Sequence, residues 1–294
     1  MASPTEANRP REMTRPKPLR RQVIGAACLG LVSLTACSPN NAKDHYILAE
    51  KLWSNGNYAA SVTEFDKVTQ RDPKGILGRQ ALFRSAMTQA LFLSQNNLAL
   101  RKFKSYIEQS GDSDVSWEAQ KQIGEILFAK TEQYDLAIPH YRAMLQARPK
   151  DPEAPDFQFR IAKSYFFLWQ FDDAIFAFKE LQKNYPNSLL AERAAFEIGV
   201  TAYTRGEQRP ATGHSTGPEG YQEAIDAYQR FLTRYPHSAL DVEARFGIAA
   251  CLEEMEQLDA AYHQYESLLK TYPSPKVIQI KLARIRQRRA QKSR

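Results

Sequence analysis

The chain has 294 residues, of which 43% are hydrophobic and 25% are charged, a composition typical of a soluble globular protein with a continuous core. Its three cysteines, Cys28, Cys37 and Cys251, cannot form an internal disulfide framework or a metal cluster. The net charge of +7 comes from the two ends, because residues 1–36 carry +4 and residues 274–294 carry +8, which leaves −5 for the rest. The overall positive charge is therefore no evidence that the central part of the chain binds nucleic acid.

The amino-terminal segment combines a basic stretch, an apolar run and a cysteine. Residues 1–22 are basic and proline-rich, and Val23–Leu34 is an apolar run of 12 residues, too short to span a bilayer but suited to a signal peptide. It ends in the letters LTAC, which resemble the bacterial lipobox, whose cysteine is lipidated and becomes the new amino terminus. The resemblance predicts that residues 1–36 are removed and that Cys37 carries the lipid anchor, including palmitate. The alternative is that Cys37 is only a small residue after a cleavage site.

The residues around this cysteine predict where the protein resides. Ser38 rather than aspartate follows Cys37, and by the sorting rule of the lipoprotein class this implies the outer membrane, with the chain facing the periplasm. Two or three acyl chains would give firm anchoring. Residues 37–43 are expected to be a short lipidated tether. Translation from Met13 instead of Met1 would give a basic segment of more ordinary length.

Residues 44–273 contain six copies of a repeat with a usual period of 37 or 38 residues. Each copy contains two segments in which residues recur at helical spacing, and each segment includes a characteristic small residue. Four positions after the downstream small residue stands an aromatic residue in every copy, and twelve positions after it a proline or glycine ends the helix. The aromatic column consists of Phe65, Phe103, Tyr141, Phe178, Tyr228 and Tyr265. The pattern predicts six pairs of helices, A and B, in an all-α superhelical solenoid.

The repeat resembles the tetratricopeptide repeat, and two phrases within it are more specific. YPNSLLAERAAFEIGVTAY, starting at Tyr185, and YPHSALDVEARFGIAACL, starting at Tyr235, resemble the repeats of bacterial outer-membrane lipoproteins of the BamD (YfiO-like) family. The resemblance implies a scaffold in the assembly of outer-membrane β-barrel proteins. Such a scaffold would bind the periplasmic domains of the barrel-forming protein and peptide segments of unfolded substrates. The alternative is another envelope repeat lipoprotein, either a Tol-Pal or cell-wall coordinator or a secretin pilotin.

Two segments depart from the repeat. The fifth copy has a surplus of about 13 residues, and its polar segment 206–219, rich in glycine, is expected to be a loop, either disordered or contacting a partner. The basic end, residues 274–294, places Ile278, Leu282 and Ile285 on one face of a helix. We expect this helix to cap the solenoid, and its charge could also attract an anionic membrane or an acidic partner.

No motif for catalysis, cofactor binding or metal binding appears. Glycine-rich phosphate loops, GxSxG and HExxH are absent, the five histidines are scattered, and Cys251 is expected to be a packed small residue. The chain has no spare domain for an enzyme such as a wall hydrolase. We therefore expect no enzyme, no cofactor, no metal and no nucleic-acid partner.

The remaining functional feature is an aromatic surface on the A helices. Stacked helix pairs form a groove lined mainly by A helices, and such grooves bind peptide segments. The A helices place aromatic residues three positions before or four after the central small residue, and these are the candidates for the groove: Tyr46, Trp53, Phe83, Phe128, Phe159, Phe166, Phe196 and Tyr203. The alternative is that many of them pack between helices. Tyr46 and Trp53 are the strongest candidates, because no helix precedes the first repeat.

Overall fold

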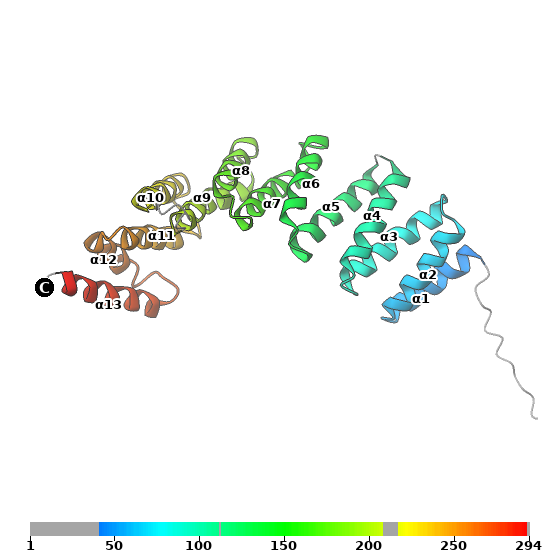
Figure 1. The fold of residues 1–294 in the computed structure, drawn as a ribbon, viewed down its shortest axis with the longest axis horizontal. Helices are drawn as coiled ribbons and strands as arrows, with labels where there is room; N and C mark the ends of the chain where they lie inside the picture. The colour runs from blue at the N-terminus through cyan, green and yellow to red at the C-terminus, as the bar shows by residue number, and fades with distance from the viewer. Residues whose placement is uncertain (1–40, 112, 208–216, 293–294) are drawn as a thin grey trace, which may run out of the picture. The chain divides into compact units, whose positions relative to one another are not determined.

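A computed structural model describes residues 41–111, 113–207 and 217–292. These residues form thirteen α-helices and no strand (Figure 1). A π-helical turn, Ile126–Lys130, continues α5. The helices are α1 (Ala42–Ser54), α2 (Tyr58–Arg71), α3 (Ile76–Leu91), α4 (Asn96–Ser110), α5 (Asp114–Glu125), α6 (Tyr134–Ala147), α7 (Ala154–Phe167), α8 (Phe171–Asn184), α9 (Leu189–Glu207), α10 (Gly217–Arg234), α11 (Asp241–Glu254), α12 (Leu258–Ser267) and α13 (Pro275–Lys292).

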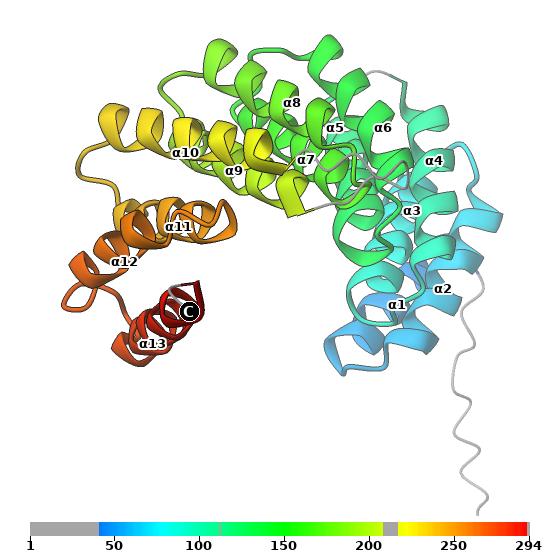
Figure 2. The ribbon, with the colours of Figure 1, turned by 60° about the vertical axis from the view of Figure 1, so that its left-hand side comes forward.

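The predicted all-α superhelical repeat fold is confirmed. Odd-numbered helices from α1 to α11 are the A helices and each packs against the B helix that follows it, so six pairs stack in chain order (Figure 2). The whole aromatic column is buried, and Phe65, Phe103 and Phe178 are fully buried. In the third and fifth repeats the ring of this column lies against the glycine of its own A helix, Gly124 and Gly199. At Gly124, for example, an added Cβ would lie 2.6 Å from the Tyr141 ring, so only glycine permits this approach.

The turns of the repeat follow from local residue chemistry. The B helices α2, α6, α8 and α10 each end two residues before a proline. Helix α4 ends at Ser110 and is followed by Gly111, which has φ of +62°. The turn from helix A to helix B also needs one residue in the left-handed region, two positions before helix B. That position is held by Gly56, Ser94, Glu132, Trp169 and Glu256. The turn geometry is thus repeated even where the residue is not glycine.

Ion pairs between successive A helices also recur along the solenoid. Arg84 on α3 pairs with Glu50 on α1 at 2.7 Å, and Arg160 on α7 pairs with Glu125 at the end of α5. Lys163 on α7 then reaches Glu197 on α9 at 3.2 Å. The partners are 34 or 35 residues apart in sequence, close to one repeat. Each pair therefore links one repeat to its immediate neighbour.

The structure corrects two predicted boundaries. The tether was expected to reach residue 43, but α1 begins at Ala42, where the Asn41 side chain caps it by accepting from the Asp44 amide at 3.0 Å. The segment 206–219 was expected to be a loop, but α9 extends to Glu207 and α10 begins at Gly217. Residues 208–216 lie outside the described residues.

Contacts near the end of α9 accompany this extension, and two of the residues that make them, Arg205 and Gly206, lie beyond the usual end of an A helix. The rings of Tyr203 on α9 and Tyr221 on α10 lie 5.6 Å apart, and Arg205 on α9 donates to Glu223 on α10. Gly206 lies directly against the Tyr221 ring. The repeat-5 insertion therefore lengthens both helices of its pair, because tertiary packing overrides the weak helix propensity of glycine and proline.

The basic carboxy-terminal helix caps the last repeat, as predicted. Ile278, Leu282 and Ile285 are buried in a cluster with α11 and α12. On the same helix Lys281, Arg284 and Arg288 surround the fully buried carboxylate of Glu253 on α11, at 3.0, 2.6 and 3.3 Å. Within the part of the chain that the structure describes, no helix is long and apolar enough to cross a membrane.

Candidate protein-binding site

The eight aromatic residues predicted to line a groove are half-buried, and most contact the B helix of their own repeat. Tyr46 meets Phe65 edge-on at 5.4 Å, Phe83 meets Phe103 at 5.6 Å, and Phe159 meets Phe178 at 5.5 Å. Phe196 lies 5.7 Å from both Tyr228 and Phe231. One side of each ring is therefore used for packing within the repeat, and its role in partner binding stays a prediction.

Trp53, Phe128 and Phe166 lie at the turns between A and B helices. The indole ring of Trp53 contacts Tyr58 and Phe92, and the Arg84 guanidinium lies 4.8 Å from its centre. Phe128 and Phe166 join a second cluster around Phe167. Tyr46 and Trp53 are partly buried although no A helix precedes them. Tyr46 packs against Phe65, and Trp53 packs against Phe92 and Arg84.

Phe196 and Tyr203 come together in one pocket of about 310 Å³, with Phe246 and Tyr272 on the other side. Burial raises the pKa of the Tyr203 hydroxyl, and the nearby Glu207 carboxylate raises it further. The hydroxyl stays protonated and can serve as a hydrogen-bond donor. Phe196 and Tyr203 are thus the two predicted groove residues that line this pocket together.

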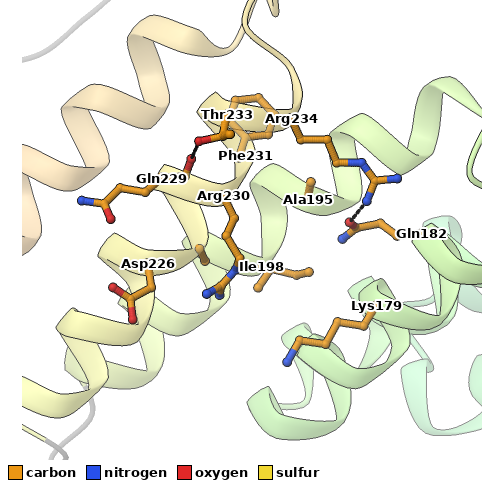
Figure 3. Close-up of a pocket in the computed structure, with 11 residues that line it drawn as sticks. Lys179, Gln182, Ala195, Ile198, Asp226, Gln229, Arg230, Phe231, Thr233 and Arg234 are labelled. Carbon is orange, nitrogen blue, oxygen red and sulfur yellow. Dashed lines mark hydrogen bonds between the residues drawn. The ribbon is translucent and has the colours of Figure 1, made fainter.

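A larger cleft, of about 620 Å³, lies between the B helices α8 and α10, with α9 as its floor. Figure 3 shows Lys179 on α8 and Arg230 on α10 facing each other across it, with Ala195 and Ile198 of α9 between them. At one end Arg234 donates to the Gln182 side chain at 3.3 Å. The cleft combines an apolar floor with a polar, mainly cationic rim.

The repeat register explains why the cleft opens here. One position of helix A, four before its small residue, faces one position of helix B, three after its small residue. In the first and third repeats these positions hold residues that bridge the two helices, and in the fourth Gln158 donates to the Ala177 carbonyl oxygen at 3.0 Å. His45 bonds Glu64 at 2.5 Å in the first repeat, and the His140 ring bonds the Gln120 carbonyl oxygen at 2.8 Å in the third. In the fifth repeat both positions are alanine, Ala195 and Ala227.

The rim of the cleft carries positive charge that is available to a ligand. Lys179 and Arg230 form no ion pair with any residue that the structure describes, whereas the A-helix cations Arg84 and Arg160 are paired. The single acid of the cleft, Asp226, accepts from Gln222 at 2.9 Å. The site therefore favours a partner segment with an apolar side chain flanked by carboxylates.

Sequence reasoning missed this cleft, because it searched for aromatic residues on A helices. The available signal was that only the fifth repeat has alanine in both columns, since the fourth pairs Gln158 with Ala177. That coincidence becomes visible only once the helices are paired in register.

Metal ligands and a reactive thiol were the remaining chemistry to look for in the described residues. No group of three histidine, cysteine or acidic side chains among them could hold a metal ion. Cys251 is buried on α11, as predicted, and burial raises the pKa of its thiol to about 12. The thiol is therefore protonated at neutral pH and a poor nucleophile.

Comparisons with known proteins agree with the repeat fold. A family described as YfiO, outer membrane lipoprotein, matches residues 126–272, which is half of the chain. The carboxy-terminal part of a tetratricopeptide-repeat protein from Cytophaga hutchinsonii is 19% identical, with a TM-score of 0.51, covering 76% of this chain and 78% of that one. A chain of Naa15/Naa10 bound to HypK-THB is 14% identical, with a TM-score of 0.61, covering 84% of this chain and 34% of that one.

PilW, a type IV pilus biogenesis factor, is 16% identical, with a TM-score of 0.47, covering 82% of this chain and 98% of that one. At these identities the structural likeness shows the fold alone. A search of curated proteins found no match.

Proposed function

Because the chain belongs to the YfiO family of outer membrane lipoproteins, we propose that it is a non-catalytic scaffold for the assembly of outer-membrane β-barrel proteins. The family match is the observation that carries this proposal. It covers α6 to α12, the part of the solenoid that contains both the α8–α10 cleft and the aromatic pocket. Lipid attachment at Cys37, outside the described residues, would hold the scaffold at the periplasmic face of the outer membrane.

The α8–α10 cleft is the proposed docking site for the periplasmic domain of the barrel-forming protein. An apolar floor gives such a contact its desolvated centre, and unpaired cations at the rim select an acidic partner surface. The A-helix aromatics remain the proposed contacts for peptide segments, with Phe196 and Tyr203 as the strongest pair.

Co-purification from detergent-solubilised outer membrane tests the scaffold role. We expect the wild-type protein to recover a barrel-assembly protein, and Arg230→Glu to lose it, because the substitution reverses charge at the rim. Arg101→Glu on the B helix α4 is the matched control, since Arg101 is also exposed and also forms no ion pair with described residues. It should leave recovery unchanged.

Two results would contradict the proposal. Recovery of other envelope proteins with no barrel-assembly protein would exclude the assembly role. Equal losses for Arg230→Glu and Arg101→Glu would leave the role intact but exclude the cleft as its site. Depletion of the protein should also lower outer-membrane barrel proteins rather than cause only division or pilus defects.

A further inference from the structure

Trp169 occupies an unfavourable backbone conformation in the turn between α7 and α8. Its φ is +62°, in the left-handed region, where a bulky residue is a clear outlier. The same turn position elsewhere holds Gly56, Ser94, Glu132 or Glu256, so nothing in the fold requires a large side chain here. The side chain is 66% exposed, so burial compensates little for the strain.

Trp169 is part of an aromatic surface that spans two neighbouring turns. Tyr134, at the start of α6, stacks on Phe167 with 4.8 Å between ring centres. Trp169 lies 6.0 Å from Phe171, and Phe167 itself is 41% exposed. We call Tyr134, Phe167 and Trp169 the Trp169 patch. It lies at the α5–α6 and α7–α8 turns (Figure 1).

Two of the predicted groove residues support this patch. Phe128 contacts both Tyr134 and Phe167, and Phe166 contacts both Phe167 and Phe171. Phe128 and Phe166 therefore hold Tyr134 and Phe167 in place, and the buried Phe171 ring lies behind Trp169. Clusters in which Trp and Tyr rest on a packed aromatic base are typical of the energetic centres of protein interfaces.

The charges in these two turns are mainly acidic. Glu132 and Asp135 flank Tyr134, and Asp173 lies in the first turn of α8; all three are exposed and form no ion pair with described residues. Asp172 pairs with Arg205. The exposed cation in the same region is Lys130. The free carboxylates outnumber it, so the surroundings of the patch attract positive charge.

The rings already show how they accept a cation. The Lys163 ammonium lies 4.6 Å from the centre of the Phe166 ring and 5.2 Å from that of Phe167. Its charge is engaged by Glu197 at 3.2 Å, on the solenoid side. Trp169 is 66% exposed, so its indole ring is accessible to a second cation, which would gain cation–π attraction and ionic contacts together.

We propose that the Trp169 patch binds a basic, apolar segment of a partner protein, with an arginine or lysine on the rings and its charge facing Glu132, Asp135 and Asp173. This ligand chemistry is opposite to that of the α8–α10 cleft, so the inference does not rest on the proposed function. An anionic membrane surface is disfavoured, because the same carboxylates repel it.

The test uses the full-length protein in detergent and two fluorescein-labelled peptides, LRLRLRLR and its acidic counterpart LELELELE. We expect the wild-type protein to bind the arginine peptide. The Trp169→Ser protein should bind it with an affinity at least about tenfold lower, as is usual when a tryptophan at the centre of an interface is removed. The matched control is Phe176→Ser on α8, since Phe176 is 64% exposed and forms no ring contact within the described residues. It should bind like the wild type.

A charge variant separates the ionic contribution from the aromatic one. A variant that combines Glu132→Gln, Asp135→Asn and Asp173→Asn should bind the arginine peptide more weakly. Its affinity should also depend less on the salt concentration. Thermal unfolding of every variant confirms that it is folded. Equal affinity of wild type and Trp169→Ser, or equal binding of both peptides, would overturn the proposal. Flotation of the protein with phosphatidylglycerol vesicles through Trp169 would overturn it in favour of a membrane contact.

Discussion

Trp169 also gives a prediction at the residue scale that is independent of any ligand. Replacing it by glycine removes the steric conflict of a left-handed residue, which costs roughly 1 kcal/mol or more. We expect Trp169→Gly to raise the free energy of unfolding by about 1 kcal/mol, measured by urea denaturation. Ser94→Gly, at the same turn position with φ of +53°, should also stabilise the protein. A less stable Trp169→Gly protein would show that the Trp169–Phe171 contact outweighs the strain.

Glu253 is the residue on which the charge of the carboxy-terminal cap converges. Glu253→Gln would leave Lys281, Arg284 and Arg288 around a neutral group. Because these cations are partly exposed, we expect the substitution to lower the free energy of unfolding by about 1–3 kcal/mol, less than the loss of a partner would cost a fully buried charge. The same change at the exposed neighbour Glu254 should cost much less. Equal unfolding midpoints for the two variants would contradict this account.

His140 gives a prediction about pH. Burial lowers the pKa of its imidazole below 6.5, because the charged form is poorly solvated, and Lys104 lowers it further. The unfolded chain therefore binds a proton at a higher pH than the folded protein. Stability is unaffected well above pH 6.5 and declines as the pH falls below it. The free energy of unfolding of a His140→Gln variant should decrease less between pH 7 and pH 5 than that of the wild type, as measured by denaturation.

At the scale of elements, the helix pairs were predictable and their extensions were not. The small and aromatic columns mark buried contacts that recur in each repeat, so Ala174, Phe178 and Pro186 were enough to place α8. The Tyr203–Tyr221 contact has counterparts in Trp53–Tyr58 and Phe128–Tyr134, whereas the longer end of α9 involves Arg205 with Glu223, a contact that the repeat pattern does not mark. The α8–α10 cleft was also missed, because it results from side chains that are small at Ala195 and Ala227.

The capping helix α13 allows a sharp test of an element. Ile285 is fully buried and Ile280, on the same helix, is 59% exposed. Ile285→Asp places an unpaired carboxylate in an apolar cluster and should cost more than about 3 kcal/mol locally, whereas Ile280→Asp should be nearly neutral. Hydrogen exchange should show lost protection in α11 to α13 while α3 to α7 stay protected. Uniform loss of protection throughout the chain would contradict this prediction.

At the scale of the whole molecule, stability is assembled from contacts between neighbours. The Arg84–Glu50, Arg160–Glu125 and Lys163–Glu197 pairs each join adjacent repeats. The aromatic column adds to these contacts, since Tyr141 stacks on Phe157 of the next repeat at 5.7 Å. A solenoid of this kind opens locally from its ends. The two proposed sites therefore use separate surfaces, since the α8–α10 cleft is lined by three helices and the Trp169 patch lies at the α5–α6 and α7–α8 turns.

The same distribution of charge predicts how the whole molecule is held at the membrane. In α13 the cations Lys281, Arg284 and Arg288 pair with Glu253, while Arg289 pairs with Asp259 and Lys292 with Glu256. Three of these cations share the single carboxylate of Glu253, and Lys276 and Arg286 form no ion pair within the described residues, so α13 keeps a net positive charge. That charge can assist contact with anionic lipid, while firm anchoring should depend on the acyl chains at Cys37. Exchanging residues 1–37 for an ordinary cleavable signal peptide should move the protein from the membrane fraction to the soluble periplasmic fraction. Cys251→Ala should leave it membrane-bound, since that thiol is buried. If the exchanged protein stays with the membrane, an attachment other than the lipid holds it there.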